Sequence, residues 1–499
     1  MSRTDTPELD QGQQWQRLDP RMLLVHPVRE LIRFLPAVIG VFLAGTASGN
    51  EVWHLVGVGV PIALGLLRYV TTSFRITAGR IELRRGLLER HVLSTPVDRV
   101  RTVDLTASPI HRALGLATVR IGTGASNEEE QLDLDSLPLA RARELRLELL
   151  RVAPPTSAEP SEPAERVVVV LDPAWVRFAP FTSSGLVLAA GTLGVASQAM
   201  NTFGGWERLD TGGLVDGVAG LPWWTLAPTA FLGLVVLVTV LAVGGYVVAN
   251  WGFALSHSDG AWHLRRGLLT TRETSLDDER LAGVSVCEPL ALRVAGGARV
   301  SAIVTGLDRK QQGSGLLVPP APRPVVLRVA RDVLGTSGPV DAPLVGHGPR
   351  AHRRRFTRAL APVGAVLAAT VLLVLVAGAP AWLLLVAAAG IPVALGLAAD
   401  RARGLGHALV DDHLVARSGS LNRHRHALAT DDVIGWTFRS TWFQRRAGLT
   451  SLSATTAGGR QAVTALDVPE PAAVGLAAAA VPGLVDQFTT QASVPARLA

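Results

Sequence analysis

Arginine side chains gather at two places in the chain where they could bind an anion. A guanidinium group binds phosphate through two parallel hydrogen bonds, so such groups are typical of a site for a phosphorylated headgroup. The alternative is structural: each group surrounds a Gly-Leu-Leu stretch, where Gly86 or Gly267 permits a close approach of the backbone in a turn between strands. Both interpretations stay open. The two groups are Arg84, Arg85 and Arg90, and Arg265, Arg266 and Arg272.

A third basic run contains Arg353, Arg354 and Arg355 and directly precedes an apolar segment. Each cation near an anionic membrane surface contributes about 1 kcal/mol to attraction. The run could therefore recruit anionic lipid, or it could serve only to fix membrane topology, and both roles are compatible.

No catalytic constellation accompanies these arginines. His424 and His426 have no cysteine or carboxylate at metal-ligand spacing. The pair Gly122 and Gly124 is followed by acidic residues and not by a helix start, which favours a hairpin loop over a phosphate cradle. Nucleophile and zinc-protease motifs are lacking. We therefore expect no enzymatic activity, no cofactor and no metal.

The arginine groups belong to a unit that occurs three times. From Gly79, steps of 7, 13 and 16 residues lead to Gly86, Arg99 and Gly115. The same ungapped steps recur from Gly260 and, in a more diverged copy, from Asp412, which predicts one domain present three times. The conserved positions in the second and third copies are Gly267, Arg280 and Gly296, and Gly419, Asp432 and Gly448.

Each unit shows short strands followed by one helix. Residues 75–77 and 81–84 alternate across the turn at Gly79, and the period changes to helical spacing after Pro138. This order predicts a small β-barrel closed by a C-terminal helix at 139–152, with further closing helices at 324–334 and 471–485. We expect Arg99 and Arg112 to form ion pairs within their own domain.

Each unit follows a pair of apolar segments, and 48% of all residues are apolar. Segments of about 17 to 25 residues can span a bilayer as helices. The flanks before each pair are rich in arginine and the turns within the pairs are not, so the three units should face the cytoplasm. For the first pair a re-entrant or buried hairpin is an alternative. The segments are 31–48 and 52–67, 183–203 and 222–249, and 359–378 and 381–399.

The net charge of +7 indicates an anionic partner, and membrane anchoring favours lipid over nucleic acid. The only cysteine, Cys287, excludes an intrachain disulfide and fits the reducing side of the membrane. We expect no cleaved signal peptide, because residues 1–20 are polar and no h-region precedes the first hairpin.

The fold class is therefore an α+β membrane protein in which three transmembrane hairpins are each followed by a cytoplasmic barrel. The expected segments are 1–30 (cytoplasmic), 31–67 (hairpin 1), 68–152 (domain 1), 153–182 (linker), 183–249 (hairpin 2), 250–335 (domain 2), 336–358 (basic linker), 359–399 (hairpin 3), 400–490 (diverged domain 3) and 491–499 (tail).

Three stretches of the first copy resemble the bacterial pleckstrin-homology-like "membrane-flanked" domain: 85–88 (Arg-Gly-Leu-Leu), 95–100 (Thr-Pro-Val-Asp-Arg-Val) and 108–119, which begins Ser-Pro-Ile-His. Repeated hairpins that alternate with such domains are similar to membrane proteins of the YdbT type. The resemblance is strong in the first copy, weaker in the second and faint in the third.

The resemblance implies a barrel of about seven strands, no catalysis, and a small related membrane partner with a single such domain. It suggests a role in envelope stress or tolerance of antimicrobial peptides. We expect a binding or scaffolding module in the inner membrane. The alternative is a lipid or peptide transporter, or a flippase, with regulatory domains, although none of the six apolar segments carries an ionisable residue near its middle.

Overall fold

The computed structural model describes residues 15–23, 25, 59, 63, 66–67, 69–77, 79–85, 91–96, 100, 102–122, 132–150, 166–202, 222–305, 315–456 and 462–485. The chain divides into two compact units, each described here by itself. Unit 1 is drawn from Met1–Val168, Gly252–Arg280 and Gly306–Ser314, and unit 2 from Val169–Trp251, Leu281–Thr305 and Gly315–Ala499. The division between Arg280 and Leu281 falls in the middle of the second sequence repeat.

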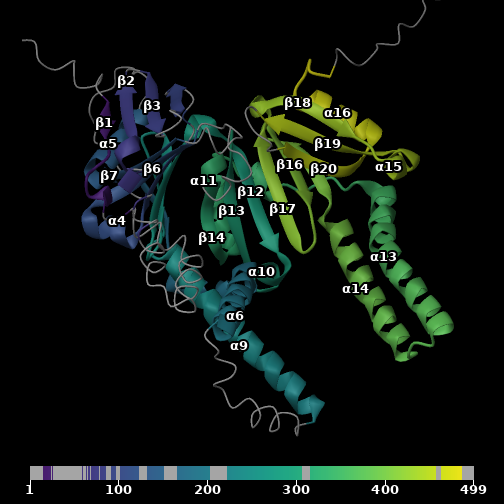
Figure 1. The fold of residues 1–499 in the computed structure, drawn as a ribbon. Coiled ribbons are helices and arrows are strands. Elements are labelled where there is room, and N and C mark those ends of the chain that lie inside the picture. Colours follow the sequence, from purple (N-terminus) through teal and green to yellow (C-terminus); the bar gives the residue numbers. More distant parts are fainter. Residues whose placement is uncertain are drawn as a thin grey trace, which may run out of the picture. The chain divides into compact units, whose positions relative to one another are not determined.

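The first repeat consists of two antiparallel layers and a closing helix (Figure 1). One layer has the strand order β1-β2-β3-β4, and the other contains β5, β6 and β7. Its elements are β1 (Gln16–Arg17), β2 (Ser73–Thr77), β3 (Arg80–Arg85), β4 (His91–Pro96), β5 (Thr102–Ala107), α4 (Pro109–Leu114), β6 (Leu116–Gly122), β7 (Leu132–Pro138) and α5 (Leu139–Leu150).

The core of this repeat follows from residue alternation. Ile81 and Leu83 of β3 and Val103 and Leu105 of β5 are buried, and Leu145 of α5 packs among them. Side chains two apart share one face of a strand, so each layer directs its apolar face toward the other and its polar face away. The predicted strands and closing helix are confirmed here.

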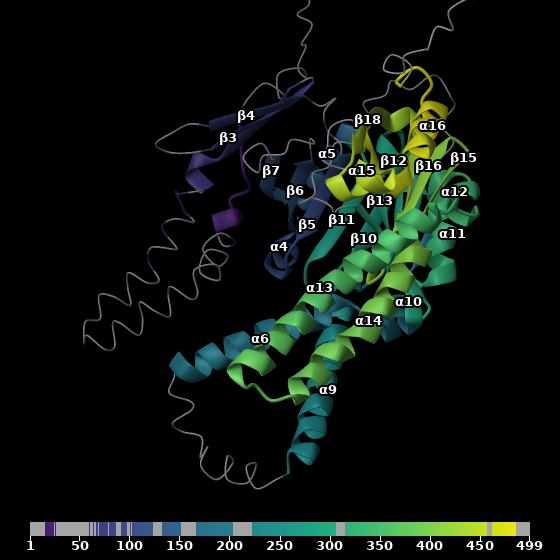
Figure 2. The ribbon, with the colours of Figure 1, turned by 90° about the vertical axis from the view of Figure 1, so that its right-hand side faces the viewer.

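The second layer does not end within the first repeat. It continues into the second repeat, in the order β7-β6-β5-β11-β10-β9-β8. Figure 2 shows β5 and β6 beside β10 and β11. The junction is an antiparallel pairing of β5 with β11, from Thr102 opposite Leu276 to Ala107 opposite Thr271. The added strands are β8 (Arg166–Val170), β9 (Ala254–Ser258), β10 (Ala261–Arg266) and β11 (Thr271–Asp277).

Unit 2 repeats this arrangement. A six-stranded sheet has the order β14-β13-β12-β17-β16-β15, so the second half of repeat two joins the first half of repeat three; a three-stranded sheet, β18-β19-β20, completes repeat three. The elements are β12 (Leu281–Pro289), α10 (Leu290–Val294), β13 (Gly297–Val304), β14 (Leu316–Pro322), α11 (Arg323–Leu334), α12 (Gly338–Asp341), β15 (Gly406–Val410), β16 (His413–Ser418), β17 (Asn422–Ala429), β18 (Val433–Arg439), α15 (Trp442–Ala447), β19 (Leu449–Thr456), β20 (Ala462–Pro469) and α16 (Glu470–Ala480).

The expectation of three separate closed barrels is therefore wrong in one respect. Sheets are shared between neighbouring repeats, because the exposed edge of β5 or β12 completes its backbone hydrogen bonds with a strand of the next repeat. The closing helices α5, α11 and α16 occur where the sequence predicts them, and α16 ends at Ala480, two residues before Pro482.

Among the residues that the structure describes, three helices are long and apolar enough to cross a membrane: α9 (Trp223–Asn250), α13 (Gly348–Ala377) and α14 (Trp382–Gly404). The last two lie side by side in both views (Figures 1 and 2). A fourth candidate is a pair bent by 67°, formed by the 3-10 helix η3 (Pro173–Phe181) and α6 (Ser183–Thr202). The first expected hairpin, 31–67, lies almost entirely outside the described residues.

Candidate functional site

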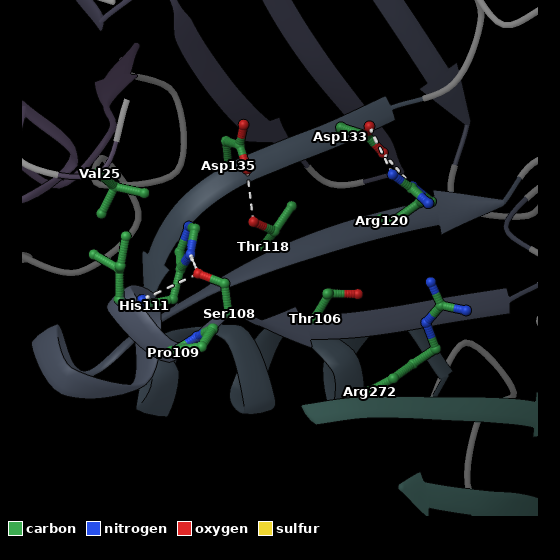
Figure 3. A pocket seen from close by; sticks show the side chains of 11 residues that line it. Val25, Thr106, Ser108, Pro109, His111, Thr118, Arg120, Asp133, Asp135 and Arg272 are labelled. Atoms are coloured by element: carbon green, nitrogen blue, oxygen red, sulfur yellow. Dashed lines mark hydrogen bonds and ion pairs between the residues drawn. The ribbon is translucent and has the colours of Figure 1, made fainter. Parts of the chain in front are cut away.

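A pocket in unit 1 lies between the start of α4 and the strands that run from β7 to β11. Its volume is about 450 Å³. Figure 3 shows polar side chains from α4, β5, β6 and β7 together with one arginine from β11 of the next repeat. The lining residues are Val25, Thr106, Ser108, Pro109, Ile110, His111, Thr118, Arg120, Asp133, Asp135 and Arg272.

The charges in this pocket are largely neutralised from within. The Arg120 guanidinium donates to Asp133 with Nε to Oδ1 at 2.9 Å, and this hydrogen bond is the main reason that the pKa of Arg120 is raised. The Thr118 hydroxyl donates to Asp135 Oδ1 at 2.6 Å. Arg272 is the cation that enters from the shared strand. The pocket can accept a small polar group, but it has little unbalanced charge.

Ser108 and His111 form a polar contact that fixes the short helix α4. Ser108 is the N-cap and accepts from the backbone N–H of His111, and its Oγ lies 2.6 Å from His111 Nδ1. The other ring nitrogen lies 3.3 Å from Ser136 Oγ on β7. Ser136 has φ +58°, so β7 is kinked where it meets the imidazole. The histidine thus ties α4 to β7.

The third repeat builds the same contact from other residues. Thr441 caps α15, Gln444 stands where His111 stands, and Gln444 Nε2 donates at 2.7 Å to Asp467 on β20. Asp467 also has φ +58°, like Ser136. A glutamine cannot act as a general base, and the contact persists without one. We therefore interpret the Ser108–His111 pair as a structural lock and not as an activated nucleophile.

In each repeat, the chain segment before a predicted membrane segment contacts the domain near this short helix. In the first repeat, Arg21 donates to the Leu114 carbonyl at 3.0 Å. In the second, Gly297 lies so close to Phe178 that an added Cβ would come within 2.7 Å of its ring. In the third, Arg354 of α13 donates to the hydroxyl of Thr441, the cap of α15, at 3.3 Å. The contacts thus reach α4 itself in the first repeat, the first residue of β13 beside α10 in the second, and the cap of α15 in the third.

The contact in the third repeat is a buried ion cluster. Asp467 is 1% exposed; its Oδ1 accepts from Arg354 Nη1 at 2.5 Å, and its Oδ2 forms an ion pair with Arg355 Nη2 at 2.6 Å. The two arginine side chains are 11% and 12% exposed. Removing one partner from such a cluster leaves an uncompensated charge in the interior. These two arginines are committed to the fold, whereas Arg353 is exposed on α13.

The structure places the other predicted arginines at different sites. Arg84 lies with its Cζ 4.9 Å from the ring of Trp15, in a cation–π contact. The side chain of Arg265 is 66% exposed, and its Nε lies 3.8 Å from Glu273 Oε1. Arg266 faces Arg272 directly across the β10–β11 hairpin. Burial, followed by repulsion from Arg272, lowers the pKa of Arg266.

Some sequence expectations fall outside these observations. The side chains of Arg85 and Arg90, together with Gly86 and Arg99, lie beyond the described part of the chain. The prediction that Arg112 forms an ion pair within its own domain is wrong, because its partner is a backbone carbonyl of the next repeat. Arg112 Nη1 donates to the carbonyl oxygen of Leu268, in the β10–β11 turn of the next repeat, at 2.6 Å.

The close approach predicted at the glycine of this turn is confirmed for Gly267. It has φ +111°, and an added Cβ would lie 2.0 Å from the carbonyl oxygen of Thr270. Gly419 in the third repeat is equivalent, with φ +101° and 1.9 Å to the carbonyl oxygen of Asn422. Both glycines are therefore required by turn geometry.

Sequence reasoning missed the lock around Gln444 and Asp467. The spacing Ser-x-x-His at Ser108 and Thr-x-x-Gln at Thr441 falls at the same repeat positions, and it is also a helix-capping signature. This signal was available. Within the described ranges, no three metal-ligating side chains come together, and His424 and His426 stack on each other with ring centroids 5.5 Å apart.

Comparison with known proteins agrees with this architecture. The family model described as "Bacterial PH domain" matches residues 30–153 and 359–478, which correspond to the first and third repeats with their preceding apolar segments. The third copy, the most diverged by motif, is thus within the match. No curated protein and no solved structure matches the chain significantly. The chain therefore contains two regions that match the bacterial PH domain, consistent with a protein of repeated PH-like domains.

Proposed function

We propose that the chain is a non-enzymatic scaffold of the inner membrane, in which three transmembrane hairpins hold PH-like domains on the cytoplasmic side. Apolar helices long enough to span and the bacterial PH-domain matches support membrane association. The arginine-rich flanks of the apolar segments support the cytoplasmic orientation.

The observation that carries this proposal is the ion cluster around Asp467. A flexible tether would leave the domain free to move on its helix. Here the first turns of α13 supply two nearly buried arginines to one buried carboxylate on β20. Such a cluster fixes the orientation of a domain relative to the helix that carries it, as a scaffold requires.

A binding role fits these repeats better than catalysis. The serine–histidine contact of the first repeat is replaced by threonine and glutamine in the third. Both contacts hold the start of the short helix in place, and only the first contains a group that could act as a base. Arg120 in the pocket is paired with Asp133, and the Asp135 carboxylate accepts from Thr118. We therefore include the lack of enzymatic activity and of a cofactor in the proposal.

For a ligand we propose anionic lipid headgroups, bound by exposed arginines. Arg353 on α13 and Arg265 on β10 have exposed side chains next to or within the repeats. Arg354 and Arg355 are not included, because both are nearly buried and paired with Asp467. A small membrane protein with a single related domain stays the proposed protein partner, and the resemblance suggests envelope stress as the setting.

Membrane orientation can be tested by cysteine labelling in intact cells. In a Cys287→Ala background, single cysteines replace Leu269 or Leu421, which are 55% and 53% exposed on the domains, or Ala381 between α13 and α14. We expect a membrane-impermeant maleimide to label only the Ala381→Cys chain until the cells are lysed. Labelling of the two domain positions in intact cells would refute the proposed orientation.

Lipid binding can be tested by native mass spectrometry of the full chain with added anionic phospholipid. We expect Arg353→Gln to retain fewer anionic lipids than wild type. Arg331→Gln is the matched control, because Arg331 is also an exposed helical arginine but is paired with Asp341 at 2.7 Å. Equal lipid retention by both variants would remove Arg353 from the proposed site.

A further inference from the structure

The sharing of sheets leaves one strand edge open at each end of the repeat series. Strand β4 of the first repeat and β18 of the third are each paired on one side only, among the residues that the structure describes. Their equivalents in the other repeats are paired on both sides: β11 and β17 resemble β4, and β5 and β12 resemble β18. An open edge presents unpaired backbone donors and acceptors.

The two internal junctions use the same register. At the first, Thr274 faces Asp104; at the second, His426 faces Ser285. Positions can be counted from the first residue of each sequence repeat, which is Gly79, Gly260 or Asp412. Thr274 and His426 each lie 14 positions after that residue in their own repeat. Asp104 and Ser285 each lie 25 positions after it in the preceding repeat. Applied to the open edges, this register places Leu93 of β4 opposite Thr437 of β18.

The short helix next to each junction also contacts the incoming turn. At the first junction, Arg112 of α4 donates to the Leu268 carbonyl. At the second, the backbone N–H of Leu290, at the start of α10, donates to the Leu421 carbonyl at 2.7 Å. Arg445 of α15 is the counterpart of Arg112, and its contact is a long one, 3.4 Å to the carbonyl of nearby Ser440. Arg445 is thus in position for a turn that this chain does not supply at that edge.

Apolar side chains are exposed around the open edge of β18. The exposed fractions are 60% for Ile434, 42% for Phe438, 53% for Trp442 and 70% for Phe443. Exposed apolar residues that cluster in this way mark an interaction surface. They lie on β18 and α15, whose equivalents in the first two repeats contact the next repeat at the internal junctions.

The open edge of β4 has matching chemistry. In the shared register Val92, which is 50% exposed, faces Phe438. At the internal junctions the residues in the Val92 position are charged: Glu273 lies opposite Leu105 and binds Arg143 and Arg146 of α5, and Arg425 lies opposite Val286 and donates to backbone carbonyls near α12. The open ends therefore pair an apolar residue with an apolar residue, where each internal junction places a charged residue opposite an apolar one.

We infer that β18 of one chain pairs antiparallel with β4 of a second copy of the same chain, in the register that places Val92 opposite Phe438. This head-to-tail contact extends the shared sheets from one copy into the next. Because the two surfaces differ, each copy has one donor edge and one acceptor edge, and the contact can continue beyond a dimer. It goes beyond the scaffold role and does not depend on any lipid ligand.

The contact can be tested by disulfide formation between two full-length chains in one membrane. Both chains carry Cys287→Ala and different tags; one carries Val92→Cys and the other Phe438→Cys. Under mild oxidation we expect a product of two chains that contains both tags. Thr437→Cys is the matched control, since Thr437 is also exposed but its side chain points to the opposite face of β18. It should give little product.

Several results would overturn the inference. The first is equal disulfide formation by Thr437→Cys and Phe438→Cys, and the second is no disulfide between chains. The third is a disulfide only to a smaller protein. The fourth comes from a chain that carries both Val92→Cys and Phe438→Cys, if its disulfide forms only within that chain. The last two would assign the edges to a related partner or to ring closure.

A second measurement does not depend on cysteine variants. We expect the mass distribution of the wild-type protein in mild detergent to shift to dimers and larger species with concentration. Phe438→Glu, which places a charge on an exposed position, should remain monomeric with unchanged circular dichroism. A wild-type chain that stays monomeric at all accessible concentrations would contradict the inference.

Discussion

Asp467 is the residue on which the contact between the third repeat and the apolar helix α13 depends. Asn has nearly the same shape and tolerates positive φ, so Asp467→Asn removes mainly the charge. Two nearly buried arginines then lack their counter-ion, and we expect a loss of about 3 kcal/mol in the free energy of unfolding. The thermal unfolding midpoint of the purified full chain measures this loss.

The control for that prediction is Asp341→Asn. Asp341 pairs with Arg331 at 2.7 Å, but the two side chains are 46% and 39% exposed. Solvent-exposed pairs contribute at most about 1 kcal/mol, so this variant should change the midpoint much less. Equal midpoints for the two variants would mean that the Asp467 cluster does not hold the helix.

His347 gives unit 2 a dependence on pH. Burial, followed by proximity to His407, lowers the pKa of His347 to about 4 from an ordinary value of 6.5. Between these values the unfolded chain binds the proton and the folded chain does not. Stability is therefore full above pH 6.5 and decreases as the pH falls toward 4, by an amount on the order of 3 kcal/mol.

The unfolding midpoint between pH 7 and pH 4.5 measures this dependence. His347→Asn removes the titrating group and keeps a donor for the Leu466 carbonyl, which His347 Nδ1 contacts at 2.8 Å. We expect a shallower pH dependence for this variant. His352→Asn, at an exposed position on α13, should behave like wild type. Identical slopes for all three proteins would rule out His347 as the source.

At the scale of elements, the β10–β11 hairpin depends on one glycine. Gly267→Ala should destabilise unit 1 by about 2 kcal/mol, because the new Cβ meets the Thr270 carbonyl in a turn with positive φ. Gly260 also has positive φ but open space around it, so Gly260→Ala isolates the backbone cost alone. Urea unfolding should rank Gly260→Ala as the milder change, and the reverse order would contradict the turn geometry.

Strands, closing helices and glycine turns could be predicted from the sequence, because each of them requires particular residue types at a particular spacing. Val103 and Leu105 alternate with polar residues, and Gly267 stands where only glycine fits. The shared sheets could not be predicted in this way. The alternation in β5 is the same whether its edge faces its own β4 or β11 of the next repeat, since backbone hydrogen bonds carry no side-chain identity.

The arginine sites show the same limit. A basic run before an apolar segment predicts a topology signal, and nothing near Arg354 in the sequence indicates that its partner is Asp467, 113 residues away. Arg112 likewise binds a backbone carbonyl of the next repeat, 156 residues away. Side-chain partners that are distant in sequence become visible only when the fold brings them together.

At the scale of the whole molecule, the compact units do not coincide with the sequence repeats. Each unit contains one complete junction, β5 with β11 or β12 with β17, and the division falls between the two halves of repeat two. The second repeat is thus the link between the two units.

Hydrogen exchange of the full chain, in a monomeric preparation, tests this account most directly. The equivalent strands β5, β12 and β18 occur once in each repeat and provide their own comparison. We predict slow exchange along the whole of β5 and β12, which lie inside shared sheets, and fast exchange at alternate amides of β18, which lies at an edge. Fast exchange at alternate amides of β5 and β12 as well would contradict the sharing of sheets and restore three separate domains.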